Sequence, residues 1–105
     1  MNRSHFVYKL IPPRATFAAD MTEAEQAVMG EHAAYWTNLF QEGSVVLFGV
    51  VMAPVGAWGL AVVEAEHEDD VRAIASDDPA VRTNLCTFDI GVMPSAVVRP
   101  RQTAA

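Results

Sequence analysis

The chain contains a single cysteine, Cys86, among its 105 residues. One thiol cannot form an internal disulfide or supply a multi-cysteine metal site. Because it stands in a strand-like apolar run, we expect Cys86 to be a small buried hydrophobe rather than a nucleophile. Histidine is almost as scarce, and His5, His32 and His67 fall on separate predicted elements without ligand spacing. No metal site is therefore expected.

Basic residues are also few. Seven Lys and Arg face thirteen Asp and Glu, which gives a formal net charge of -6 at pH 7. Nucleic acids and anionic membranes are bound by basic surfaces, so we expect neither as a partner. The sequence has no glycine-rich phosphate loop, nucleophile elbow or nucleotide fingerprint. We therefore expect a small-molecule ligand or substrate and no cofactor.

Long uninterrupted apolar runs are missing as well. The first fourteen residues, MNRSHFVYKLIPPR, have no apolar stretch long enough for a signal peptide. The apolar run 45–63 is broken by Pro54, Gly56 and Gly59, which favours a β-hairpin over a membrane helix. These features predict a cytoplasmic protein.

Apolar residues make up 51% of the chain and charged residues 19%, which is typical of a folded domain. The length fits one domain over 1–105, with a core at about 5–100 and a loose tail at 101–105. The apolar fraction is high for so small a body. We therefore expect part of the apolar surface to be buried against a partner subunit.

The hydrophobic pattern predicts strands and helices in alternation. In chain order we expect strand 5–11, helix 22–42, strands 44–53 and 57–66, helix 68–75, strand 83–93 and a short edge strand 96–99. Thr22 and Glu25 form a capping box for the long helix, and Gly43 is placed to end it. The buried stripe of this helix has spacings of three and four and comprises Val28, Met29, His32, Tyr35, Trp36, Leu39 and Phe40.

The order β-α-β-β-α-β predicts an α+β fold of the ferredoxin-like type, a four-stranded antiparallel sheet with both helices on one face. The strand 44–53 is apolar at nearly every position, so both of its faces must be covered. One domain has no further element to cover the second face. We therefore predict a homodimer through the sheet faces, which gives a dimeric α/β barrel.

His32 is the first candidate catalytic residue, because an imidazole in an apolar stripe is suited to moving protons near neutral pH. Asp78, in the turn Ser76-Asp77-Asp78-Pro79, is the second, as a carboxylate that orients the imidazole. Both residues also have purely structural interpretations. A core histidine is often satisfied by a carbonyl or carboxylate, and Asp before Pro is a common turn former.

Five residues are candidates for substrate binding. Tyr8, Trp36 and Phe48 are suited to lining a pocket for a flat ring, or belong to the core or a dimer interface. Tyr8 and Phe48 are favoured because we expect them on central strands. Gly49 is either a cavity floor or a bulge, and Arg14 either receives an anionic group or is solvated.

Four local features, taken in order, resemble the YCII-related (YciI-like) family of small dimeric α+β barrel proteins over roughly 6–100. They are the helical His32, the pair Glu42-Gly43 followed by a strand reaching Gly49, the dipeptide Asp78-Pro79, and the pair Arg99-Pro100. The resemblance implies an active site made of the helical histidine and the Asp-Pro aspartate. On this chain those residues are His32 and Asp78.

One branch of the family is similar to dehydrochlorinases of chlorinated quinol degradation. The first hypothesis is therefore an isomerase or a lyase-like enzyme that transfers protons on a compact cyclic or aromatic metabolite. The alternative is a binding or accessory module that holds a ligand in the same cavity without turnover. A third hypothesis is haem or oxygen chemistry, as in the barrel monooxygenases of the wider superfamily.

Overall fold

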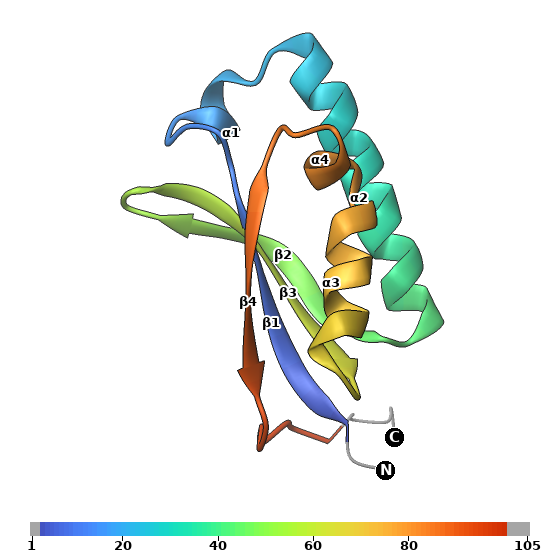
Figure 1. Ribbon diagram of the computed structural model, residues 1–105. Helices are drawn as coiled ribbons and strands as arrows, with labels where there is room; N and C mark the ends of the chain where they lie inside the picture. The colour runs from blue at the N-terminus through green and yellow to red at the C-terminus, as the bar shows by residue number, and fades with distance from the viewer. Residues whose placement is uncertain (1–2, 101–105) are drawn as a thin grey trace, which may run out of the picture.

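The strands form one antiparallel sheet in the order β2-β3-β1-β4, as seen in a computed structural model that describes residues 3–100 (Figure 1). The strands are β1 (Ser4–Ile11), β2 (Val45–Ala53), β3 (Gly56–Ala65) and β4 (Thr87–Met93). This spatial order and the predicted sequence of strands and long helices define a ferredoxin-like α+β fold. The predicted fold class is confirmed.

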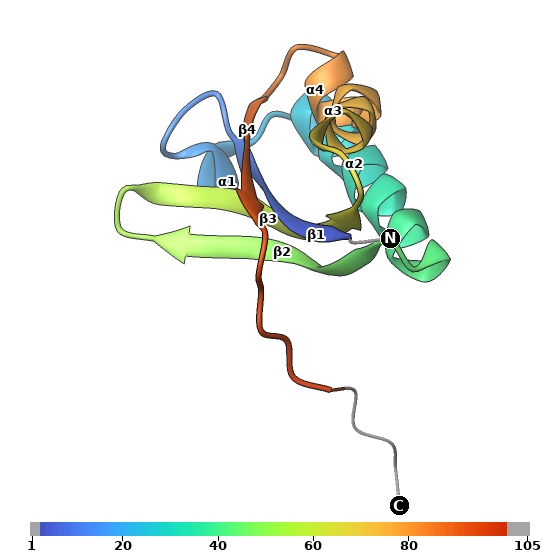
Figure 2. The ribbon, with the colours of Figure 1, turned by 60° about the horizontal axis from the view of Figure 1, so that its bottom comes forward.

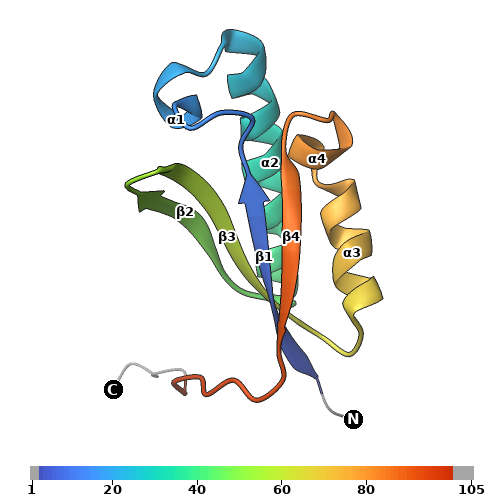
Figure 3. The ribbon, with the colours of Figure 1, turned by 60° about the vertical axis from the view of Figure 1, so that its left-hand side comes forward.

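Two long and two short helices accompany the sheet: α1 (Phe17–Asp20), α2 (Glu23–Glu42), α3 (Glu68–Asp77) and α4 (Pro79–Arg82). Helices α2, α3 and α4 lie on one face of the sheet (Figures 1 and 2). Figure 3 looks onto the opposite face, which no helix of residues 3–100 covers. No helix in this part of the chain combines the length and hydropathy needed to cross a membrane.

The caps of α2 are those that the sequence predicts. The Thr22 side chain accepts a hydrogen bond from the backbone N–H of Glu25, and the Glu25 carboxylate accepts one from the backbone N–H of Thr22. These bonds satisfy two backbone donors that a helix start leaves free. Gly43 ends the helix with a φ of 97°, a left-handed conformation that glycine adopts readily.

The core lies between the sheet and the helices. Alternate residues of β1, namely Phe6, Tyr8 and Leu10, point to the helices and are almost fully buried. Trp36 of α2 packs against them with 1% of its surface exposed. Further along α2 the predicted stripe is less complete, because Phe40 is 48% exposed. The inward side of α3 contributes Val71, Ala75 and, half-buried, Ile74.

The predicted strand 83–93 starts too early, because β4 begins only at Thr87. Residues 83–86 instead form turns after the short helix α4, which begins where Asp78 caps it and Pro79 occupies its first position. Proline fits this position, because its fixed φ suits a helix start and its missing N–H has no partner to lose there. The chain then reverses at Asn84, whose φ of 62° is left-handed.

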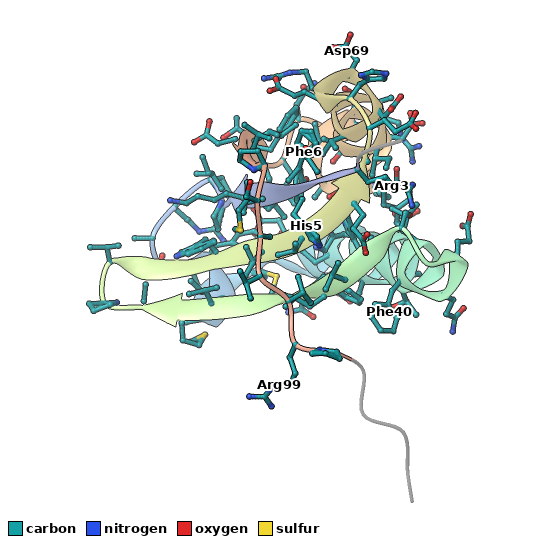
Figure 4. All side chains as sticks on the ribbon, turned by 90° about the horizontal axis from the view of Figure 1, so that it is seen from below. Arg3, His5, Phe6, Phe40, Asp69 and Arg99 are labelled. Carbon is teal, nitrogen blue, oxygen red and sulfur yellow. The ribbon has the colours of Figure 1, made fainter. Side chains whose placement is uncertain are left out.

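Three smaller predictions are also corrected. Residues 96–99 form no strand, because the chain leaves the sheet in a turn after β4, and Figure 4 shows Arg99 far from the sheet. The loop 12–21 contains α1, which buries Phe17. Phe48 lies on an edge strand, because β2 pairs only with β3. The predicted loose tail 101–105 lies outside the described residues.

Replacing Thr22 with Ala removes one half of the capping box. We expect the free energy of unfolding to fall by about 1 kcal/mol in a urea titration. Thr37→Ala is the matched control, because Thr37 is exposed in the middle of α2 and its hydroxyl only bonds the Ala33 carbonyl of the preceding turn. It should not destabilise the protein, since alanine has the higher helix propensity. Equal losses in both variants would contradict the capping role.

Candidate active site

The carboxylate of Asp78 is completely buried and accepts hydrogen bonds from four groups. The Tyr8 hydroxyl and the Trp36 indole N–H each donate to Oδ2 over 2.8 Å. The Ala80 backbone N–H donates to Oδ1 over 2.9 Å. His32 Nδ1 lies 2.9 Å from both oxygens. A buried charge of this kind is tolerated only when it is paired and hydrogen-bonded, as it is here.

Asp78 is held in this place by the junction between two helices. Its backbone N–H donates to the Ala75 carbonyl and so caps the end of α3, while its side chain caps the start of α4. Pro79 follows directly and is also buried. Helix punctuation and contact with His32 were alternative readings of the sequence, and in the structure one side chain serves both.

His32 lies on α2 one turn before Trp36, so both side chains reach the same carboxylate. The ionised carboxylate accepts a hydrogen bond from Nδ1–H. This bond fixes the tautomer in which the other nitrogen, Nε2, carries a lone pair. Within residues 3–100, Nε2 has no hydrogen-bond partner, and the side chain remains 18% exposed. The imidazole can therefore accept a proton from a molecule beside it.

The hydrogen bonds decide the charge on Asp78. Burial by itself raises the pKa of this carboxyl, but the hydrogen bonds from His32 and Trp36 outweigh burial and keep the pKa below its ordinary value. Burial and the nearby Asp78 charge raise the pKa of Tyr8 above its ordinary range. Burial, followed by the same charge, raises the pKa of Cys86 to about 11. At neutral pH the aspartate is therefore ionised, while the phenol and the thiol keep their protons.

A cavity of about 290 Å³ lies between α2, the segment that carries α1, and the hairpin of β2 and β3. His32, Tyr8 and Trp36 are part of its wall. The remaining lining is almost wholly apolar and contains no Lys, Arg, Asp or Glu. A small apolar cavity with one convergent polar group is the usual form of a ligand site.

The other aromatic and glycine candidates are placed around this cavity. The rings of Tyr8 and Trp36 pack against each other with centroids 4.8 Å apart, and both residues donate a hydrogen bond to Asp78. Phe48 and Gly49 line the cavity from the edge strand β2. A Cβ added at Gly49 would meet nothing within 4 Å, and the irregularity of β2 lies between Val45 and Leu47. Neither steric crowding nor a bulge therefore requires the glycine.

Arg14 has partners other than the anionic ligand group that we considered from the sequence. Its guanidinium donates two hydrogen bonds to Glu25 and further ones to Asp20, and it is not part of the cavity lining. The hydrogen bonds from Arg14, and next the one from the Thr22 backbone, lower the pKa of Glu25 to about 2. This cluster attaches the segment carrying α1 to the start of α2. Phe17 of that segment stacks under the guanidinium and closes the cavity on this side.

Tyr8 and Trp36 were predicted to lie near a ligand, but the hydrogen bonds that both donate to Asp78 were not predicted. A partial signal was present. Tyr8 alternates with Phe6 and Leu10 on the buried face of β1, and Trp36 follows His32 by four residues on α2.

No three His, Cys, Asp or Glu side chains of residues 3–100 are grouped so that they could hold a metal ion.

Comparison with known proteins identifies the family. Residues 8–93 match the model of the YCII-related domain, and the chain belongs to this family. No curated protein matches the sequence. Two crystal structures of SnoaB, a cofactor-independent oxygenase from Streptomyces nogalater, are similar to the chain at 14% and 15% identity. One of the two is a point variant, and each match has a TM-score of 0.48 and covers 96% of this chain and 100% of SnoaB. This likeness carries no conclusion about activity.

The Asp78→Asn variant tests the hydrogen-bond centre. We expect the free energy of unfolding to fall by about 3 kcal/mol at neutral pH, because an amide cannot accept from all four donors. The difference from the native protein should shrink as the pH falls below 3.8, the ordinary pKa of an aspartate, since the stabilisation from a depressed pKa is lost on protonation. Urea titrations at several pH values measure both effects.

The control for this variant is Asp77→Asn, the exposed neighbour, which should change stability by no more than about 0.5 kcal/mol. The His32 ring should also lose its fixed tautomer in Asp78→Asn, as the chemical shifts of its two ring nitrogens measure by NMR. Identical ring-nitrogen shifts in the two proteins would show that the carboxylate does not act on the ring.

Proposed function

We propose that the protein is a small-molecule enzyme in which His32 and Asp78 transfer a proton on a compact cyclic or aromatic metabolite. The observation that carries the proposal is the geometry of the pair. A buried, ionised carboxylate holds one ring nitrogen, the other nitrogen has no hydrogen-bond partner within residues 3–100, and the residue lines an apolar cavity. This is the arrangement that a general base requires.

In this mechanism, Nε2 of His32 accepts a proton from a C–H or O–H group of the substrate. The Asp78 carboxylate stabilises the imidazolium ion so formed, while the electron pair of the broken bond stays on the substrate as an enolate or phenolate. Returning the proton to a different carbon completes an isomerisation. If the electron pair instead forms a C=C bond and expels an anionic leaving group such as halide, the result is an elimination. Neither reaction needs a cofactor.

Tyr8, Trp36 and the Ala80 backbone act through Asp78. Their three hydrogen bonds fix the carboxylate and keep it ionised, so that it orients the imidazole and does not take the proton itself. Phe48 and Gly49 of β2, with the ring faces of Tyr8 and Trp36, would surround the substrate ring. We propose these residues as the substrate-binding wall.

A non-catalytic binding or accessory module is the alternative, and one observation favours it. Tyr8 and Trp36 both use their polar hydrogen on Asp78, and the Cys86 thiol keeps its proton, so His32 is the one side chain of the lining left to exchange a proton with a ligand. A reaction that needs a separate acid on the other side of the substrate would lack that acid. Binding of a ligand through a single polar contact needs no such group.

The test is hydrogen exchange on weakly acidic rings. We incubate the protein in D₂O with a panel of cyclic enones and phenols and follow deuterium incorporation at ring carbons by NMR. The native protein should accelerate exchange of at least one compound, and His32→Gln should reduce the rate about 100-fold or more, because a positioned base contributes that much. His67→Gln, on an exposed histidine, is the matched control and should keep the native rate.

Binding of a panel compound without accelerated exchange would favour the binding module. Exchange that persists at the native rate in His32→Gln would reject the proton-transfer role of this residue.

We also propose that the helix-free face of the sheet binds a second copy of the chain. The central strands present Val7, Leu60 and Val62 on this face, because their neighbours in sequence point to the helices. Leu47 of β2, paired with Val62, is 46% exposed on the same face. Apolar side chains in the centre of a sheet face are costly to leave in water.

We assign the homodimer to the cytoplasm, where an unpaired cysteine such as Cys86 stays reduced.

Light scattering at micromolar concentration should give the mass of a dimer. Val62→Glu places a charge in the middle of the proposed interface and should give a monomer. Ala73→Glu, on the exposed side of α3, introduces the same charge elsewhere and should leave the dimer intact. A native protein that is monomeric under these conditions would contradict the proposal.

A further inference from the structure

The floor of the cavity consists of the smallest side chains of the sheet. Inward-facing positions on β1 carry Tyr8 and Leu10, and the residues that pair with them on β3 are Ala61 and Gly59. Ala57 comes two residues before Gly59 and therefore lies on the same face. All three small residues line the cavity. At these positions the sheet offers little more than backbone and Cβ atoms.

Leu10 of β1 covers Gly59, whereas Ala57 and Ala61 carry only a Cβ toward the cavity. Elsewhere on β3 the inward position is occupied by Val63, which is completely buried against the core. A Cβ at Gly59 would already come within 3.1 Å of the Leu10 Cβ, so this part of the floor has no room for a side chain unless Leu10 moves. The opposite wall is α2, with His32 and Trp36. The cavity is therefore a slot between the sheet, with these small residues on β3, and the helix α2.

The slot is also uncharged. Two cations lie beside lining residues without belonging to the lining: Arg14, which is already paired with Glu25 and Asp20, and Lys9, whose ammonium lies over the ring of Trp58. Behind the wall, His32 contacts the Asp78 carboxylate, which is negative. A carboxylate or phosphate ligand would lose its hydration and gain no cationic partner except a protonated His32. A neutral ligand does not incur this cost.

We propose that Ala57, Gly59 and Ala61 are specificity-determining residues, and that the site selects uncharged, flat ring compounds with one dissociable proton and excludes carboxylates and phosphates. Phenols and cyclic enols are the simplest members of this class. The inference rests on the proposed function, because the dissociable proton is the one that His32 would accept. The flat ring lies on the β3 floor, and its acidic group faces the helix.

The experiment compares two probes of one shape, 2-naphthol and 2-naphthoate, by fluorescence titration of the native protein. We expect 2-naphthol to bind at least about tenfold more tightly than 2-naphthoate. Ala61→Val adds two methyl groups to the floor and should weaken 2-naphthol binding by about tenfold or more through overpacking. Ala73→Val, the same change on the exposed side of α3, should bind 2-naphthol as the native protein does.

Ala57→Val is the second floor variant. Ala57 is half-buried, so this change tests the floor even if Ala61→Val does not fold. Ala57→Val should also weaken the binding of 2-naphthol. It should weaken the binding of unsubstituted phenol, a smaller ring, by less. Native binding of 2-naphthol by both floor variants would overturn the role of the floor. Equal or tighter binding of 2-naphthoate, or no binding of 2-naphthol, would overturn the selection for uncharged rings.

His32→Gln separates this inference from the proposed function. If His32→Gln keeps the preference for 2-naphthol and also exchanges hydrogen at the native rate, the selectivity stands and the proton-transfer role fails. If exchange depends on His32 but the floor variants bind normally, the proposed function stands and the assignment of the floor fails.

Discussion

The buried carboxylate of Asp78 is the constraint on which the arrangement of this protein depends. It receives hydrogen bonds from β1 through Tyr8, from α2 through His32 and Trp36, and from the start of α4 through Ala80. An ionised group without these partners would be too costly to bury. The helices and the sheet are therefore held in the one relative position in which every donor reaches the same two oxygen atoms.

The same interaction links stability to chemistry. Because Asp78 stays ionised, it fixes the tautomer of His32, a residue of the cavity wall, and leaves the second ring nitrogen without a hydrogen-bond partner within residues 3–100. The two aromatic donors give their polar hydrogens to the carboxylate and are also part of the cavity lining. A polar centre and an apolar wall are thus made from the same side chains, and the cavity is left with a single polar group of its own.

Local sequence signals predicted much of this structure. Thr22, Glu25 and Gly43 mark the ends of α2, and the order of strands and long helices predicts the ferredoxin-like sheet. His32 and Asp78 were identified as a pair from their residue types and from the family resemblance. Their distance was beyond sequence reasoning, because 46 positions separate them and only the packed fold determines where they meet. The late start of β4 was missed for a related reason, since Asp78 begins an extra helix there.

The long sequence separations at Asp78 have a consequence for how the protein folds. Its partners Tyr8, Trp36 and His32 lie 70, 42 and 46 positions away, so the carboxylate is satisfied only when β1, α2 and the α3–α4 junction are all in place. Closing such large loops costs chain entropy and slows folding. A chain in which one of these three parts is not yet packed therefore lacks an oriented His32 imidazole.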